Sequence, residues 1–306
     1  MSRATVKVGG PRPAGFGRRK TFSLRGTSPN VLHGFISGAQ TRRARSRAPL
    51  RDDFGSHFHV DRTASGLLPS AKVREDVWLA LADGTRLHGW FVRAERQPAA
   101  ATIIYLHGNG GNLSHLDWLG RSLAGKGFDV LLLGYRGYGR SEGAATDERG
   151  LYEDSDAAYD YVSKARGVPQ EKIVLYGQSL GTAAAVDVAA RRPCGALILE
   201  SGLSSASDMA AAIIPWLPRF THRLLRNRLD SMGKLPHVRC PVLVAHGDRD
   251  EVIPVEQGHR LFAAAPEPKR LVIVRGAGHN NLSIIGSEPY LKDVAGFINE
   301  SVRAGF

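Results

Sequence analysis

Six short apolar segments recur along this chain from residue 101 onward, and amphipathic segments separate them. The apolar segments are Ala101–Leu106, Asp129–Leu133, Ile173–Tyr176, Ala196–Leu199, Val242–Ala245 and Leu271–Val274. Continuous apolar runs of this length are typical of strands that are buried on both faces of a parallel sheet. Other segments, such as residues 113–123 and 291–302, place their apolar residues on one helical face. Strands that alternate with helices predict an α/β fold with a doubly wound, mostly parallel sheet.

A β-hairpin is predicted ahead of these strands. Val77–Leu81 and Leu87–Val92 both have strand-like composition, and the Asp83-Gly84 pair between them is a tight-turn signal.

The N-terminal residues differ in composition from the rest of the chain. Residues 1–51 hold twelve of the 41 Lys and Arg residues and no Asp or Glu, which leaves 29 basic residues against 29 acidic ones afterwards. We therefore predict a basic, disordered leader over residues 1–65 and a formally neutral globular domain over residues 66–306. The leader has three interpretations: a transit-type presequence, a segment for weak contact with anionic surfaces, or a tail without a role. Because the domain itself is neutral, the net charge of +12 does not predict nucleic-acid binding.

Other composition signals concern the compartment and metals. No run approaches the ~18 apolar residues of a membrane-spanning helix, and we expect a cytoplasmic protein, with organelle targeting or peripheral membrane association through the leader as alternatives. Cys194 and Cys240 are predicted to be reduced thiols packed near strand starts. His57 and His59 have no partner at zinc-like spacing, and we expect no metal and no cofactor.

The pentapeptide Gly177-Gln178-Ser179-Leu180-Gly181 follows one of the predicted strands directly and opens a predicted helix over Leu180–Arg191. Gly-x-Ser-x-Gly between a strand and a helix is typical of a nucleophile elbow, a sharp turn that lifts the serine hydroxyl above the sheet edge. The helix then directs its first NH groups, Leu180 among them, toward any oxyanion that forms there.

A serine hydroxyl needs a base within hydrogen-bond reach, and the base needs an orienting acid. His279 follows the strand Leu271–Val274 and is the candidate base. Asp248 and Asp250 both follow the strand Val242–Ala245 and compete for the role of the acid. The chain order Ser, Asp, His is the order found in α/β-hydrolases.

A second oxyanion donor is expected after the strand Ala101–Leu106. The segment His107-Gly108-Asn109-Gly110-Gly111-Asn112 is rich in glycine, which lets the backbone approach a reacting carbonyl. We select the NH of Asn109 as this donor. A phosphate-binding loop is disfavoured because no Gly-Lys-Ser/Thr follows.

Together these motifs make residues 70–306 resemble the α/β-hydrolase superfamily. The motifs are His107–Asn112, Tyr135–Ser141, Gly177–Gly181, His246–Pro254 and Gly278-His279. The combination is similar to the short-lid branch that includes membrane-associated serine hydrolases and palmitoyl-protein thioesterases. This resemblance implies that Asp250, the third residue after the His246-Gly247 pair, is the triad acid, and that Asn109 is the oxyanion residue.

The resemblance also implies a lid insertion, which we place at about residues 203–239. Its apolar run over residues 213–220 lines an acyl pocket, contacts an interface, or packs the lid on the core. The expected activity is hydrolysis of a small-molecule or acylated ester or thioester through an acyl-enzyme on Ser179. A serine peptidase of the same fold and a non-catalytic binding protein on a hydrolase scaffold are the alternatives.

Overall fold

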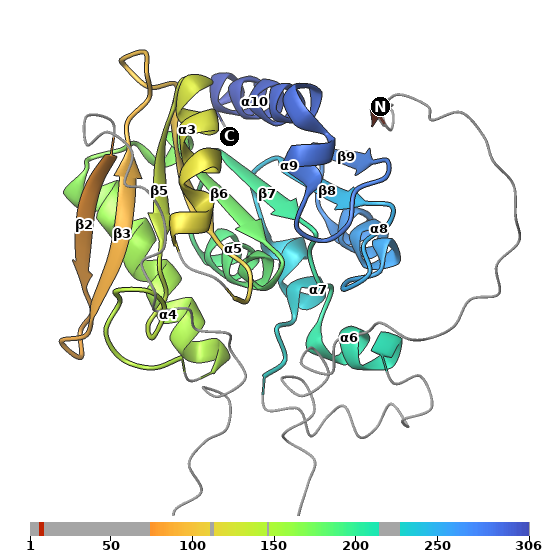
Figure 1. Cartoon of the computed structure of the whole chain (residues 1–306), viewed down its shortest axis with the longest axis horizontal. Helices are drawn as coiled ribbons and strands as arrows, with labels where there is room; N and C mark the ends of the chain where they lie inside the picture. The colour runs from red at the N-terminus through yellow and green to blue at the C-terminus, as the bar shows by residue number, and fades with distance from the viewer. Residues whose placement is uncertain (1–5, 9–73, 111–112, 146, 214–226, 306) are drawn as a thin grey trace, which may run out of the picture.

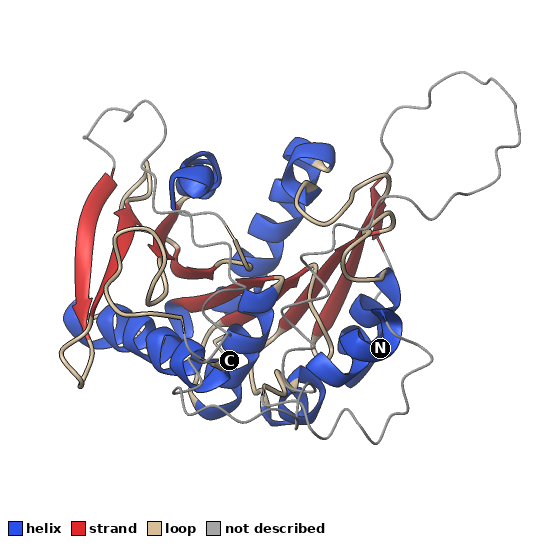
Figure 2. Ribbon diagram, turned by 60° about the horizontal axis from the view of Figure 1, so that its bottom comes forward, coloured by secondary structure: helices blue, strands red, loops and turns tan. Residues whose placement is uncertain are grey.

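The computed structural model describes residues 6–8, 74–110, 113–145, 147–213 and 227–305. These residues form a nine-stranded sheet in the order β1-β9-β8-β7-β6-β4-β5-β3-β2. Helices cover both faces of the sheet (Figure 1 and Figure 2). The predicted doubly wound α/β fold is therefore confirmed.

The strands from β2 onward agree with the predicted hairpin and apolar runs to within a few residues. They are β1 Val6–Val8, β2 Arg74–Ala80, β3 Arg86–Val92, β4 Ala101–Leu106, β5 Phe128–Leu133, β6 Ile173–Gln178, β7 Ala196–Glu200, β8 Val242–Gly247 and β9 Lys269–Val274. The predicted hairpin is confirmed, because β2 and β3 pair antiparallel around a turn in which Gly84 has a φ of 86°. β3 also pairs antiparallel with β5, and all other neighbouring strands pair parallel.

The described helices and helical turns lie between the strands and after β9. They are η1 Leu113–Leu116, α3 Asp117–Gly125, α4 Glu148–Asp160, η2 Tyr161–Ala165, η3 Gln170–Lys172, α5 Leu180–Arg191, α6 Ala206–Ile213, α7 Ser231–Lys234, η5 Leu235–His237, α8 Val255–Ala264, α9 Leu282–Ile285 and α10 Ser287–Ala304.

The central strands are apolar on both faces, and each face packs against a different set of helices. In β4, Ile104 belongs to an apolar cluster that includes residues of α4, α5 and α8, whereas Ile103 and Tyr105 belong to a second cluster that includes residues of α3 and α10. Successive strand residues point to opposite faces, so a continuous apolar run fills two layers at once. This explains why the strands were recognisable as uninterrupted apolar runs.

The N-terminal leader supplies one element that the sequence does not predict. Val6–Val8 forms the edge strand β1 and pairs parallel with β9, with Val6 opposite Val272 and Val8 opposite Val274. For these three residues the predicted disorder is wrong. The pairing uses the backbone groups that an edge strand leaves free, and composition does not report on such groups. Residues 1–5 and 9–73 lie outside the described residues, so disorder over the rest of the leader stays a prediction.

The predicted lid is described at its two ends, residues 203–213 and 227–239. The ends are joined at their base: the NH of Ala206 donates to the carbonyl of Arg228 (2.8 Å), and the NH of Met232 donates to that of Ser204 (3.1 Å). The side chains of the apolar run 213–220 lie outside the described residues.

The two cysteines lie just ahead of β7 and β8. Cys194 and Cys240 are both buried free thiols, as expected for residues packed near strand starts. Their Sγ atoms are 3.1 Å apart, a contact that their separation of 46 positions in the chain does not reveal.

Candidate active site

The connection from β6 to α5 is a sharp turn centred on Ser179. Ser179 has φ 54° and ψ −118°, a backbone conformation that residues other than glycine rarely adopt. A Cβ atom on Gly181 would lie 1.9 Å from the carbonyl oxygen of Leu106, and one on Gly177 would lie 2.4 Å from that of Gly181. Both glycines are therefore required by the close approach of backbone on the two sides of the serine.

The structure brings Ser179, His279 and Asp250 together from three loops that follow β6, β9 and β8. The Nε2 atom of His279 lies 2.9 Å from Oγ of Ser179, and its Nδ1 atom lies 2.8 Å from Oδ2 of Asp250. An ionised carboxylate can only accept a hydrogen bond, so Nδ1 carries the proton of the neutral ring. The lone pair of Nε2 is then free to accept the hydroxyl proton of Ser179.

Asp248, the competing candidate for the acid, has a different contact. Its Oδ1 atom accepts a hydrogen bond from the backbone NH of Gly276 at 2.6 Å, in the loop after β9. Asp248 thus braces the loop that leads to His279, while Asp250 contacts the imidazole.

The carboxyl group of Asp250 is fully buried and well supplied with donors. Its Oδ1 atom accepts from the backbone NH groups of Val252 and Ile253 at 2.9 and 2.8 Å, and its Oδ2 atom lies 3.3 Å from Nε2 of His246. Burial would raise the pKa of Asp250, but the hydrogen bonds from His246, His279 and Ile253 outweigh it and hold the pKa well below its usual value. The group is therefore ionised at neutral pH.

The candidate oxyanion loop after β4 is held by two side chains. The NH of Gly108 donates to Oε1 of Gln178 at 2.9 Å, and the hydroxyl of Tyr138 donates to Oδ1 of Asn109 at 2.9 Å. Because the NH of Gly108 is already bonded to Gln178, the backbone NH of Asn109 is the candidate donor. Within the described ranges no acceptor is bonded to it. Gly111 and Asn112 lie outside those ranges.

The NH of Leu180 belongs to the first turn of α5, where backbone donors have no carbonyl partner within the helix. Leu180 follows Ser179 directly, and a Cβ atom on Gly108 would lie 3.0 Å from Cβ of Ser179. Both predicted oxyanion segments therefore adjoin the serine.

His107 directly follows β4 and makes a hydrogen bond within the loop. It is buried, and its Nδ1 atom donates to the carbonyl of Gly108 at 2.7 Å. Burial lowers the pKa of His107 to about 4, although the bond to Gly108 opposes this shift. The ring is therefore neutral at pH 7, and it packs against the rings of Tyr135 and Tyr138 with centroid distances of 4.4 and 5.2 Å.

A buried acid that sequence reasoning missed lies beside the elbow. The carbonyl of Glu200 accepts from the NH of Ser179 at 2.9 Å, and its carboxyl accepts from the hydroxyl groups of Tyr290 (2.6 Å) and Tyr176. Burial raises the pKa of Glu200 above its usual value, despite these two donors. A glutamate at the end of an otherwise apolar run was the available signal in the sequence.

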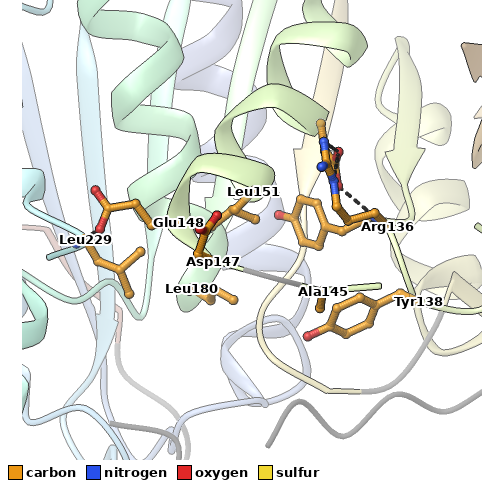
Figure 3. Close-up of a pocket in the computed structure, with 10 residues that line it drawn as sticks. Arg136, Tyr138, Ala145, Asp147, Glu148, Leu151, Leu180 and Leu229 are labelled. Carbon is orange, nitrogen blue, oxygen red and sulfur yellow. Dashed lines mark hydrogen bonds and ion pairs between the residues drawn. The ribbon is translucent and has the colours of Figure 1, made fainter. Parts of the chain in front are cut away.

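A small cavity of about 20 Å³ lies beside Leu180, the residue after Ser179 (Figure 3). Its lining residues are Tyr135, Arg136, Tyr138, Ala145, Asp147, Glu148, Leu151, Asp154, Leu180 and Leu229. Leu180 follows Ser179, the hydroxyl of Tyr138 bonds to Asn109, and Leu229 comes from the base of the predicted lid. Arg136 and Asp154 pair with each other at 2.8 Å (Figure 3). The cavity thus has a mainly apolar surface and reaches the residue that follows the serine.

Among the described residues, no group of three or more His, Cys, Asp or Glu side chains is arranged to hold a metal ion. No helix in these ranges combines the length and the apolar composition needed to cross a membrane.

Comparisons with known proteins agree with this architecture. Residues 97–233 match a family described as serine aminopeptidase, S33. The chain is 37% identical over 243 residues to an uncharacterised Mycobacterium tuberculosis protein, covering 79% of this chain and 84% of that protein. It is 31% identical over 245 residues to the alpha/beta hydrolase domain-containing protein WAV2 of Arabidopsis thaliana, covering 74% of this chain and 79% of WAV2. An esterase structure from Pyrococcus furiosus aligns with a TM-score of 0.65 at 17% identity, over 79% of this chain and 97% of that one, which is a likeness of fold.

Proposed function

We propose, from the premise that this chain belongs to the α/β-hydrolase family, that it is a serine hydrolase of carboxylic esters or thioesters. The observation that carries the proposal is the continuous hydrogen-bonded series Ser179–His279–Asp250, with contacts of 2.9 and 2.8 Å. Family membership alone does not determine the activity, because one fold serves many functions.

In the proposed mechanism, Oγ of Ser179 attacks the carbonyl carbon of the substrate while Nε2 of His279 removes the hydroxyl proton. Asp250 holds the imidazole in the correct tautomer and stabilises the imidazolium that forms. The NH groups of Asn109 and Leu180 donate to the oxyanion of the tetrahedral intermediate. His279 then protonates the leaving alcohol or thiol, and water, deprotonated by the same imidazole, releases the acid from the acyl-enzyme.

The apolar surface beside Leu180 favours an acyl group as the part of the substrate that lies next to the serine. Leu180, Leu229 and Tyr138 would contact the first carbons of such a group, since the cavity they line has a volume of only about 20 Å³. An acylated protein or small molecule, as in the palmitoyl-protein thioesterase-like branch that the motifs resemble, is our proposed substrate class.

A serine peptidase is the second candidate, and the match to a serine aminopeptidase family favours it. The same three residues would serve amide cleavage, with His279 protonating a leaving amine. Comparison of a p-nitrophenyl ester series of increasing acyl length with aminoacyl p-nitroanilides distinguishes the two candidates. Faster turnover of the amides would overturn the esterase assignment.

The test of the mechanism uses a fluorophosphonate probe, which labels an activated serine. Wild-type protein should be labelled at Ser179, and Ser179→Ala should abolish labelling. Ester turnover should fall on the order of 10⁴-fold or more in both Ser179→Ala and His279→Ala. Wild-type protein that neither reacts with the probe nor hydrolyses any ester or amide would instead support a binding protein on this scaffold.

A further inference from the structure

Gln178 occupies the variable position before Ser179 and is the last residue of β6. This strand lies between β4 and β7 in the middle of the sheet. From there the side chain of Gln178 reaches two different loops. Its Oε1 atom accepts from the NH of Gly108 at 2.9 Å, and its Nε2 atom donates to Oδ1 of Asn280 at 3.2 Å.

The first of these contacts bears on the proposed oxyanion donor. Gly108 precedes Asn109, so a hydrogen bond to the NH of Gly108 restricts rotation of the backbone just ahead of the donor. The hydroxyl of Tyr138 holds the side chain of Asn109 from another direction. A Cβ atom on Gly108 would lie only 2.6 Å from Oε1 of Gln178, so the glycine is needed for this contact.

The second contact bears on the proposed base. Asn280 follows His279 directly, and on the other side of the histidine the NH of Gly278 donates to Oδ1 of Asn281 at 2.8 Å. The loop is therefore hydrogen-bonded on both sides of His279. Gly278 bonds through its backbone NH, and Asn280 bonds through its side chain to the amide of Gln178.

We propose that Gln178 is a positioning residue that couples the loop of the oxyanion donor to the loop of the base, an inference that rests on the proposed function. One rigid amide sets the distance between the two loops, and it extends from the residue adjacent to the nucleophile. Donors and bases that are already in place before reaction need no reorganisation in the transition state, whereas a displacement of about 1 Å can cost about 10²-fold in rate.

The direct test is Gln178→Met, which keeps the length of the side chain and removes both hydrogen bonds. We expect kcat for a p-nitrophenyl ester to fall by roughly 10- to 100-fold, while KM stays within about twofold because Gln178 does not line the apolar cavity beside Leu180. Gln170→Met is the matched control, since Gln170 is exposed next to the opposite end of β6. An unchanged kcat in Gln178→Met would overturn the proposal.

A second variant separates coupling from two independent contacts. Asn280 is exposed, so Asn280→Ala should fold normally and lose only the contact to the base loop. Its kcat should fall by less than that of Gln178→Met, and the double variant should equal Gln178→Met within about twofold. Effects that multiply in the double variant would show that the two loops are not coupled through Gln178.

Hydrogen exchange supplies a readout that does not depend on catalysis. The amide of Gly108 should exchange faster in Gln178→Met than in wild-type protein or Gln170→Met. Equal exchange would overturn the proposed anchor even if kcat fell. If the wild-type protein is inert toward esters, amides and the fluorophosphonate probe, the proposed function fails, and faster exchange would leave Gln178 as a structural bridge without a catalytic role.

Discussion

Asp248 and Asp250 have the same chemistry and stand two positions apart, but they bond to different partners. Asp250 contacts His279, and Asp248 contacts the backbone NH of Gly276. We expect Asp250→Asn to lower kcat by roughly 10²- to 10⁴-fold, because an amide no longer fixes the tautomer of the imidazole. Asp248→Asn keeps an acceptor oxygen for Gly276 and should change kcat by less than about tenfold. Steady-state kinetics on both variants decide the assignment, and a reversed order would make Asp248 the acid.

The buried His107 predicts how the stability of the fold depends on pH. The folded-state pKa of about 4 lies below the ordinary value of 6.5, so the unfolded chain takes up this proton first as the pH falls. The neutral ring makes its full contribution to the free energy of unfolding above pH 6.5. This contribution, roughly 3 kcal/mol, is lost as the pH falls toward 4.

The variant His107→Asn tests this linkage, because its side-chain amide can still donate to the carbonyl of Gly108 but does not titrate. Denaturant unfolding at a series of pH values should show a smaller loss of stability between pH 6.5 and 4 in the variant than in wild-type protein. Identical pH slopes would mean that the buried ring does not titrate as its environment implies.

The elbow between β6 and α5 requires the start of α5 to pack so closely against the end of β4 that no side chain fits between them. A Cβ atom on Gly181 would clash with the carbonyl of Leu106 in β4, and backbone cannot move aside as a side chain can. We expect Gly181→Ala to lower the free energy of unfolding by about 3 kcal/mol or more.

Gly296 provides the matched control within a helix. A Cβ atom at this position of α10 meets nothing within 4 Å, so Gly296→Ala should raise the stability by about 0.5–1 kcal/mol. Denaturant melts of both variants test the argument, which would be wrong if the two glycines tolerated alanine equally.

The predicted leader and the globular domain meet at the edge of the sheet. Every residue of the proposed site lies between residues 107 and 280, whereas β1 is the edge strand and pairs with β9. We expect deletion of residues 1–65 to keep ester hydrolysis within about twofold and to lower the melting temperature slightly, because three residues of pairing are lost. Thermal melts and kinetics on the truncated chain test this, and a truncated protein that does not fold would refute an independent domain.

Local patterns in the sequence were sufficient for most of the fold. Runs such as Ala101–Leu106 indicate burial on both faces, since successive side chains of a strand point to opposite faces. The limits of α5 follow from the elbow and from the apolar helix after it. The strand β1 was missed because backbone pairing at an edge leaves no compositional mark. The contact between Cys194 and Cys240 was missed because it joins residues 46 positions apart.

The sequence alone determined the α/β class, the elbow at Ser179 and the set of candidate partners, because each depends on residues close together in the chain. Only the tertiary structure decided three contacts. These are the contact of His279 with Asp250 instead of Asp248, the hydrogen bond from Tyr138 to Asn109, and the bridge made by Gln178. The contacts of Gln178 join residues 70 and 102 positions apart. Such distances are set by how strands stack in the sheet, and no periodicity along the chain encodes them.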